Sequence, residues 1–292
     1  MKDIISIIAG ILKVSKDEIC DIRTLKKGMT NQSFLFSFDG NKYIFRLPGA
    51  GTENLLNRQQ EMNVYKAIEN KGICRNPVYI DESGYKITRF IENARVCNPG
   101  NLSDVKQCIE ALKKMHELRL HVDHVFDIYE QIEKYEKLWG DNCSLHDDYR
   151  ETKENTLSLK EIVSSVPKEF VLTHIDAVPD NFLLSADSKI ELIDWEYAGM
   201  QDPHVDIAMF AIYAFYDKTQ IDALIDIYFE GKCPHSIRTK IYCYISLCGL
   251  LWSNWCEYKH ILGYNFGDYS DRQYNYAKEF YEIAMKEAST NV

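Results

Sequence analysis

The sequence predicts an α+β fold in which a small, β-rich N-terminal part precedes a larger, mainly helical part. Residues 33–38 and 42–47 each alternate polar and apolar side chains and are joined by an Asp-Gly turn, a strong signal for a β-hairpin. Most of residues 103–288 instead shows apolar residues at helical spacing. One group of short strand-like segments, between residues 170 and 193, interrupts these helices.

The N-terminal part is expected to be a small sheet with one inserted helix. Apolar residues recur at helical spacing over residues 1–15, which predicts a first amphipathic helix. After the first hairpin, residues 53–70 carry a second helical pattern that ends at a Lys-Gly pair. Residues 78–80 and 85–91 then form a second predicted hairpin around an Asp-Glu-Ser-Gly turn.

A natural boundary follows this second hairpin, so we expect two parts at residues 1–92 and 93–292. In the second part Ser103 is the expected N-cap of the first helix, because its hydroxyl can accept a hydrogen bond from a backbone N–H of the first turn. Further helices are predicted at 125–139, 155–166, 205–216, 219–230, 236–260 and 271–288, and short strands at 170–172, 182–184 and 189–193.

The composition is that of an ordinary soluble protein. Hydrophobic residues make up 46% of the 292-residue chain and charged residues 27%, so a sizeable core is available. The formal net charge of -10 argues against a non-specific nucleic-acid binder, which needs Lys and Arg to neutralise phosphates, and favours a cationic ligand. No apolar run approaches the roughly 18 residues that a membrane span requires.

The cysteines and histidines indicate neither a disulfide framework nor a zinc site. There are nine cysteines, an odd number without a C-x-x-C pair, which indicates a reducing compartment, and we expect a cytoplasmic protein. His116, His121 and His124 lie close together, but their spacing matches no recognised metal pattern, so polar helix-end histidines are the better interpretation.

The strongest functional pattern lies in the strand-like group. His174, Asp176 and Asn181 form an H-x-D pattern with an Asn after it, and an apolar strand then ends in Asp194 and Glu196. Phosphoryl transfer explains this grouping, because a hydroxyl nucleophile needs a carboxylate such as Asp176 to orient it and accept its proton. The triphosphate needs Mg²⁺, which prefers oxygen ligands such as those of Asn181 and Asp194. The alternative is a turn rich in Asp and Asn that caps the strands.

These two loops, H-I-D and D-W-E in this sequence, resemble the catalytic and metal loops of the protein-kinase-like fold. The version that they resemble is that of aminoglycoside phosphotransferases and choline/ethanolamine kinases, and the resemblance covers nearly the whole chain. It implies a bilobal fold, ATP and Mg²⁺ as cofactors, and a metal role for Glu196 beside Asn181 and Asp194. It also implies that Asp206 supports the backbone of the catalytic loop and that His174 has a similar structural role.

The resemblance further implies a nucleotide site in the N-terminal part. The G-M-T-N segment at 28–31 resembles the family's phosphate loop, although it has one of the two usual glycines. Arg46 matches the basic residue that grips the phosphates, and Glu61 matches its ion-pair partner. Residues 88–91 match the hinge that faces adenine. The residues expected at the nucleotide are Gly28, Thr30, Asn31, Arg46, Glu61, Thr88, Arg89, Phe90 and Ile91.

The acceptor site is expected among aromatic residues of the C-terminal part. A quaternary ammonium has no N–H to donate and is recognised by aromatic faces, each worth about 0.5–2 kcal/mol. The L-W-S segment at 251–253 resembles that of choline kinases, but the second tryptophan follows three residues later than in the family's usual pattern. Packing in the core is the alternative use of such a helix. The candidate acceptor residues are Asp176, Tyr197, Trp252, Trp255 and Tyr269, followed by Tyr213 and Tyr216.

Taken with the resemblance, these patterns predict an ATP-dependent kinase that phosphorylates the hydroxyl of choline to give phosphocholine and ADP, with Asp176, Asn181 and Arg46 as catalytic residues. Two alternatives stay open. One is a kinase of another acceptor, such as ethanolamine or an aminoglycoside. The other is a non-catalytic ligand-binding protein of the same fold, which the presence of Asp176, Asn181 and Asp194 disfavours.

Overall fold

The computed structural model describes residues 2–27, 31–49, 51–185 and 189–290. Contacts along the chain divide it into two compact units: unit 1 is Met1–Arg95 with Leu184–Glu196, and unit 2 is Val96–Leu183 with Tyr197–Val292. The sequence predicted two parts, at residues 1–92 and 93–292. The contacts instead place the later segment Leu184–Glu196 in unit 1. It joins unit 1 because the Leu192 N–H donates to the carbonyl of Ile73 at 3.1 Å and Arg75 pairs with Glu191 at 2.6 Å.

Unit 1 is built on a five-stranded antiparallel sheet with the strand order β1-β2-β3-β5-β4. Its predicted first hairpin is confirmed, with Phe38 opposite Asn41 at the tip. Asp39 and Gly40 both have positive φ, as a tight two-residue hairpin turn requires. The strands are β1 (Cys20–Lys27), β2 (Asn31–Phe38), β3 (Asn41–Pro48), β4 (Tyr79–Ile80) and β5 (Lys86–Arg89).

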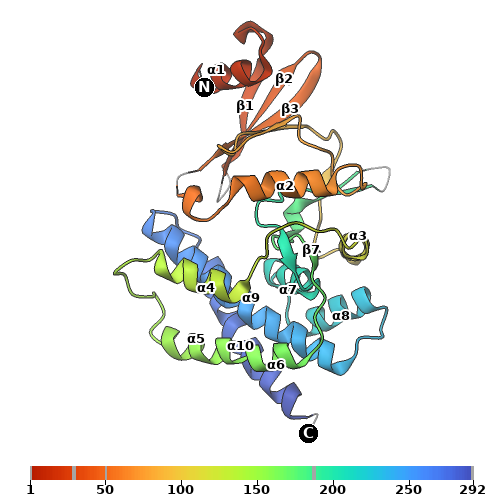
Figure 1. Ribbon diagram of the computed structural model, residues 1–292, viewed down its shortest axis with the longest axis vertical. Coiled ribbons are helices and arrows are strands. Elements are labelled where there is room, and N and C mark those ends of the chain that lie inside the picture. The colour runs from red at the N-terminus through yellow and green to blue at the C-terminus, as the bar shows by residue number, and fades with distance from the viewer. Residues whose placement is uncertain (1, 28–30, 50, 186–188, 291–292) are drawn as a thin grey trace. The chain divides into compact units, whose positions relative to one another are not determined.

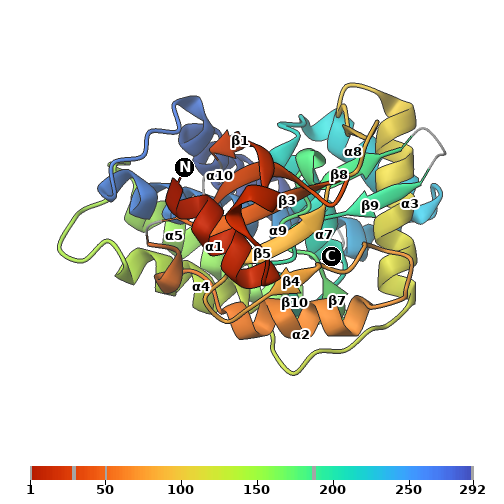
Figure 2. The same ribbon diagram turned by 90° about the horizontal axis from the view of Figure 1, so that it is seen from above.

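Two helices accompany this sheet. Helix α1 (Lys2–Leu12) lies across it (Figure 2), and Ile8 packs into an aromatic cluster with Phe36 and Phe45, all fully buried. Helix α2 (Arg58–Ile68) begins later than predicted. The side chain of Asn57 caps it by accepting from the N–H groups of Gln59 and Gln60. The preceding residues form a short 3₁₀ turn, η2 (Thr52–Asn54); another, η1 (Lys16–Glu18), follows α1.

Unit 2 is mainly helical and is organised around the long helix α9, which is buried over most of its length. Figure 1 shows α9 and α10 side by side. Gly249 permits this approach, since a Cβ there would lie 2.6 Å from the carbonyl oxygen of Gln273. The helices are α3 (Leu102–Glu117), α4 (Ile128–Lys137), α5 (Tyr149–Ser158), α6 (Lys160–Ser165), α7 (His204–Tyr213), α8 (Lys218–Phe229), α9 (His235–Ile261) and α10 (Asp268–Ser289).

The helix boundaries depart from the predicted ones where caps decide them. Asn101, rather than Ser103, caps α3, because its side-chain oxygen accepts from the N–H groups of Ser103 and Asp104. The single helix predicted at 155–166 is two helices, α5 and α6, that meet at Leu159. The 3₁₀ turn η3 (Pro179–Asn181) lies in the predicted catalytic loop.

Short strands complete the structure. In unit 2, β7 (Val171–Thr173) pairs antiparallel with β10 (Gly199–Gln201), a strand that the sequence pattern did not predict. The remaining strands are β6 (Arg95–Val96), β8 (Phe182–Leu184) and β9 (Ile190–Leu192).

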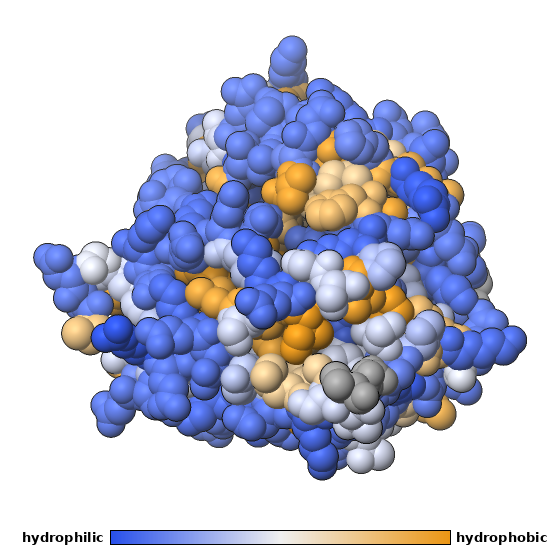
Figure 3. Space-filling view, turned by 60° about the horizontal axis from the view of Figure 1, so that its bottom comes forward, coloured by the Kyte–Doolittle hydropathy of each residue, from blue (hydrophilic) through white to orange (hydrophobic). Residues whose placement is uncertain are grey.

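The face drawn in Figure 3 is largely hydrophilic, with small apolar areas between charged side chains. Within the described ranges, no helix combines the length and the apolar character that crossing a lipid bilayer would demand.

Candidate active site

Asp176 lies in unit 2, in the loop that follows β7, and two side chains hold its carboxylate. The Tyr213 hydroxyl donates to Oδ1 at 2.8 Å. The Asn181 amide nitrogen donates to Oδ2 at 3.1 Å and to the Asp176 carbonyl at 2.9 Å. The structure thus brings together two of the predicted catalytic residues and fixes the orientation of the expected base.

The backbone of this loop is anchored by Asp206, in the first turn of α7. Its buried carboxylate accepts from the N–H of His174 at 2.9 Å and from the N–H of Ile175 at 2.7 Å. Its Oδ2 also lies 2.9 Å from Nε2 of His116, whose other ring nitrogen contacts the Tyr228 hydroxyl. The predicted supporting role of Asp206 is confirmed.

The anchor holds a strained conformation. Ile175 has a φ of 66°, a region that a β-branched residue rarely adopts, at a cost of about 1–3 kcal/mol. Because Ile175 and His174 are fully buried, their N–H groups need a protein acceptor, and Asp206 supplies it.

An aromatic cluster lies in the same unit and is joined to Asp176 through Tyr213. We define it as Tyr197, Tyr213, Trp252, Trp255, Phe266 and Tyr269. The Trp252 ring lies 5.3 Å from Tyr197, 5.7 Å from Tyr213 and 5.8 Å from Trp255, measured between ring centroids. Tyr269 stacks on Tyr213 at 6.5 Å, and Phe266 lies 5.4 Å from Trp255.

Most of the predicted acceptor residues are therefore neighbours, with Phe266 as an additional member. The Trp255 indole nitrogen donates to the Tyr197 hydroxyl at 3.1 Å, which ties two rings together. Burial, followed by the nearby Asp176, holds the pKa of Tyr213 well above its usual range. Tyr216 is placed differently: its hydroxyl donates to the carbonyl of Pro99 at 2.5 Å, and its ring packs on Phe210.

Unit 1 contains a second group of predicted residues, which we call the charge cluster: Asn31, Arg46, Arg58, Glu61, Lys86, Asp194 and Glu196. Arg46 donates to Glu61 at 2.6 Å, to Asp194 at 3.1 Å and to Glu196 at 3.2 Å. Lys86 donates to Glu61 at 2.9 Å and approaches Asp194 at 3.4 Å. The predicted pair of Arg46 and Glu61 is present within this larger network.

Glu196 is a second carboxylate of the charge cluster that several donors hold, as they do Glu61. Its Oε2 accepts from Arg58 and from Asn31, each at 2.8 Å, and from Arg46 at 3.2 Å. The cluster has three cations and three carboxylates, so charge is balanced where burial would penalise an unpaired ion. Burial raises the pKa of Glu61, but the charges of Arg46 and Lys86 outweigh it and leave that pKa well below its ordinary value.

Asp194 is the most exposed carboxylate of the charge cluster. The Asp194 side chain is 34% exposed, whereas that of Glu196 is 2% exposed and engaged by the three donors above. In unit 2, Asn181 donates its amide nitrogen to Asp176, so its amide oxygen is the atom with which it could bind a cation. Carboxylate and amide oxygens are ligands that Mg²⁺ accepts, and the metal role expected for Asp194, Asn181 and Glu196 stays a prediction. Among the residues that the structure describes, no group of three or more His, Cys, Asp or Glu side chains is placed so that it could hold a metal ion by itself.

The predicted hinge lies at the end of β5. Arg89, Phe90 and Ile91 line a hollow of about 550 Å³ in unit 1, together with Lys42 and Arg75. The N–H of Phe90 donates to the carbonyl of Lys42 at 2.9 Å, so this group extends the sheet. Thr88 lies within the sheet opposite Ile44. Gly28 and Thr30 of the predicted phosphate loop lie outside the described residues.

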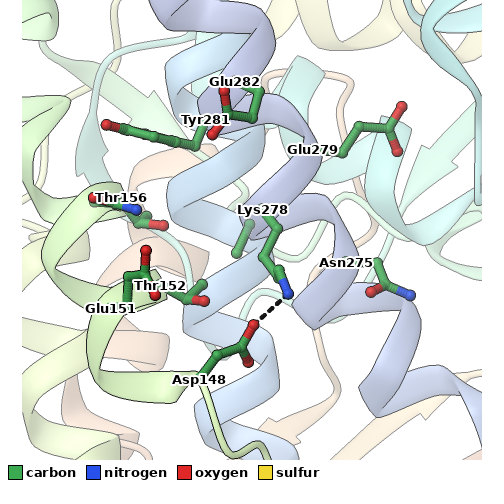
Figure 4. Close-up of a pocket in the computed structure, with 11 residues that line it drawn as sticks. Asp148, Glu151, Thr152, Thr156, Asn275, Lys278, Glu279, Tyr281 and Glu282 are labelled. Carbon is green, nitrogen blue, oxygen red and sulfur yellow. Dashed lines mark hydrogen bonds and ion pairs between the residues drawn. The ribbon is translucent and has the colours of Figure 1, made fainter.

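A further hollow, of about 700 Å³, lies in unit 2 between α5 and α10 (Figure 4). Its lining is acidic, with Asp148, Glu151, Glu279 and Glu282, and Asp148 pairs with Lys278. None of the predicted site residues contributes to this lining.

Sequence reasoning missed Lys86. It lies directly opposite Arg46 in the pairing of β3 with β5, and it is 6% exposed. Two cations on neighbouring strands repel unless carboxylates lie between them. The sequence signal for Lys86 was a second basic residue in a short apolar strand. Its pairing with Arg46 depends on the register of the two strands, which the sequence alone does not give.

Comparisons with known proteins show the family and the fold of this chain. The family model for choline/ethanolamine kinase matches residues 22–234. Protein LicA of Haemophilus influenzae is 30% identical over 262 residues, covering 83% of this chain and 75% of LicA. The crystal structure of choline kinase LicA from Streptococcus pneumoniae superimposes with a TM-score of 0.84 at 28% identity, covering 97% of this chain and 98% of that one.

A more distant likeness extends to an amicoumacin kinase, with a TM-score of 0.70 at 14% identity, which supports the fold alone. The match to the family model covers most of the chain, and the α+β architecture agrees with that of the solved kinases. The chain therefore belongs to the choline/ethanolamine kinase family and is a small-molecule kinase with a protein-kinase-like fold.

Proposed function

We propose that this kinase transfers the γ-phosphoryl group of ATP to the hydroxyl of choline, forming phosphocholine and ADP. The observation that carries the proposal is the hydrogen bond from Tyr213 to Asp176, which connects the expected base to the aromatic cluster. A cationic head group on these rings would leave its own hydroxyl close to the carboxylate. The named LicA choline kinase, which shares the fold over nearly the whole chain, supports the same substrate class.

The aromatic cluster suits a methylated ammonium better than an aminoglycoside. Aromatic faces attract a cation that has no N–H groups, and tryptophan is the strongest of them. Trp252 and Trp255 are each 3% exposed, so an ion held there would be largely desolvated, which strengthens the attraction. An aminoglycoside carries many ammonium N–H groups and would need several carboxylates. Asp176 is a carboxylate that contacts this cluster, through the hydrogen bond from Tyr213.

The chemistry follows from Asp176. Its carboxylate accepts the proton of the choline hydroxyl as the choline oxygen attacks the γ-phosphorus. The bond between this phosphorus and the bridging oxygen of ADP breaks, and ADP leaves. Asn181 keeps the carboxylate oriented during this step.

Arg46 and Asp194 are proposed to serve the nucleotide. Mg²⁺ held by Asp194 and Asn181 would offset the charge of the phosphates. Arg46 already lies in contact with Asp194, so its guanidinium is placed to neutralise phosphate oxygens next to that carboxylate. The LicA structure solved with AMP supports nucleotide binding in this family. The metal role that the resemblance implies for Glu196 stays a prediction; in this structure its carboxylate accepts from Arg46 and Arg58.

The test is ADP release with ATP and Mg²⁺ in the presence of choline, ethanolamine or kanamycin. We expect choline to give the highest kcat/KM. Trp252→Leu should raise the KM for choline roughly tenfold or more, because it removes one strong aromatic face. The matched control is Trp139→Leu, which truncates another buried tryptophan of unit 2 whose ring packs on Tyr149.

The outcomes separate the hypotheses. A raised KM in Trp252→Leu with an unchanged KM in Trp139→Leu supports the aromatic site. Preferred turnover of ethanolamine or kanamycin would retain the kinase and reject choline as the acceptor. Equal KM values in all three proteins would reject the aromatic cluster as the acceptor site.

A further inference from the structure

Helix α7 contacts the catalytic loop at both of its ends. Asp206, in the first turn, binds the backbone N–H groups of His174 and Ile175. Tyr213, the last residue of the helix, donates its hydroxyl to the Asp176 carboxylate. These two residues are about two helical turns apart and therefore lie on one face of α7. One rigid element thus fixes both the backbone and the side chain of the loop that carries the base.

Tyr213 also belongs to the aromatic cluster. Its ring contacts Trp252 and stacks on Tyr269, while its hydroxyl, on the same rigid ring, lies 2.8 Å from Oδ1 of Asp176. Ring and hydroxyl cannot move independently. A ligand that presses on the ring therefore acts on the hydrogen bond to the base.

We propose that Tyr213 is a positioning residue that couples binding of the acceptor's cationic head to alignment of Asp176. This inference rests on the proposed function. The ring offers a face to the ammonium, and the hydroxyl holds one carboxylate oxygen, so that the remaining lone pair points at the acceptor hydroxyl. The effect is geometric: a freely rotating carboxylate would meet the hydroxyl in many orientations, whereas one held by both Tyr213 and Asn181 meets it in one.

The substitution Tyr213→Phe isolates this role, because it keeps the ring and removes the hydroxyl. We expect the kcat for choline to fall roughly 10- to 100-fold, the effect of one hydrogen bond to a charged group, while the KM for choline changes by less than about twofold. Tyr213→Leu, which also removes the ring, should in addition raise the KM. The matched control is Tyr276→Phe, which removes a buried hydroxyl that donates to the carbonyl of Tyr216 at 2.8 Å.

A double-mutant cycle with Asp176→Asn distinguishes positioning from a general structural effect. If Tyr213 acts through Asp176, adding Tyr213→Phe to Asp176→Asn should cause no further loss of the residual rate. The same loss in both backgrounds would overturn the proposal, as would an unchanged or higher kcat in the single variant.

The result does not depend on choline being the natural acceptor. If wild-type protein phosphorylates another acceptor of the panel faster, the same cycle is run with that acceptor. In that case the proposed function fails while the role of Tyr213 is still tested. A fall in kcat that Tyr213→Phe causes only in protein that retains Asp176, and not in Asp176→Asn, supports the coupling. A raised KM with an unchanged kcat in Tyr213→Phe would show that the Tyr213 hydroxyl contributes only to binding, and would reject the positioning role.

Discussion

Asp206 offers the sharpest test of how this catalytic loop is held. The substitution Asp206→Ala removes the acceptor of two buried N–H groups, those of His174 and Ile175, and a contact to the His116 ring. Each buried donor left without an acceptor costs about 1–3 kcal/mol. Summing the two amides and the ring gives an expected loss of roughly 3–9 kcal/mol in the free energy of unfolding.

The conservative variant refines this magnitude. Asp206→Asn keeps one acceptor oxygen, so one of the two N–H groups remains served. We expect a loss of about 1–3 kcal/mol, corresponding to one unsatisfied donor. We therefore predict that the free energy of unfolding decreases from the wild type to Asp206→Asn and further to Asp206→Ala.

The assay is urea unfolding followed by tryptophan fluorescence, since Trp139, Trp252 and Trp255 all lie in unit 2. The urea midpoint of Asp206→Ala should fall by about 1 M or more. The control is Asp123→Ala, whose side chain is 99% exposed and whose loss should change the free energy by less than about 0.5 kcal/mol. A midpoint for Asp206→Ala that matches the control would refute the anchoring role.

Three further predictions concern packing and charge. Lys86→Met should destabilise unit 1 by about 3–5 kcal/mol in urea unfolding, because it leaves Glu61 with less compensating charge; an unchanged or higher stability would contradict this. Gly249→Ala should lower the Tm, at a cost of about 1–3 kcal/mol, because the added methyl meets backbone of α10, whereas helix propensity alone would raise it. For Asp202, burial raises the pKa, but the contacts of its carboxylate with His204 and then with Lys240 lower it to about 2. Its folded pKa is below its unfolded value, so about 2 kcal/mol of stability present above pH 4 should disappear between about pH 4 and 2, and urea midpoints of Asp202→Asn should lack this step.

Local sequence patterns predicted much of the architecture because they report local physics. The hairpin around Asp39 follows from alternation and a turn whose residues tolerate positive φ. Most helices follow from apolar spacing. Helix ends were less predictable, because the geometry of the side chains decides which residue caps a helix. Asn57 and Asn101 accept hydrogen bonds from the first turns of α2 and α3, whereas Ser103 was the predicted cap of α3.

The candidate site was predictable where one loop contains it and less so where it depends on packing. Asp176 and Asn181 lie five residues apart, and their contact follows from a tight loop. Lys86 was missed because its partners, Glu61 and Asp194, are far away in sequence. The hydroxyl contact of Tyr213 with Asp176 likewise depends on the path of α7, so the sequence indicated an aromatic residue but not its second role.

Helix α7 connects these observations with function. It contacts the loop backbone through Asp206 and the carboxylate of Asp176, the proposed base, through Tyr213, whose ring belongs to the aromatic cluster. We therefore expect stability and reactivity to depend on different ends of one helix. Variants of Asp206 should chiefly affect unfolding, whereas Tyr213→Phe should chiefly affect kcat.

The most direct measurement compares wild-type protein and Asp176→Asn with choline, recording phosphocholine by ³¹P NMR and choline binding by tryptophan fluorescence. If Asp176 is the base beside an aromatic ammonium site, the wild type forms phosphocholine. The variant then binds choline with similar affinity but turns over roughly 10²–10⁴-fold more slowly. Equal turnover by the two proteins, or the absence of any choline-dependent change in fluorescence, would contradict the assignment of this site.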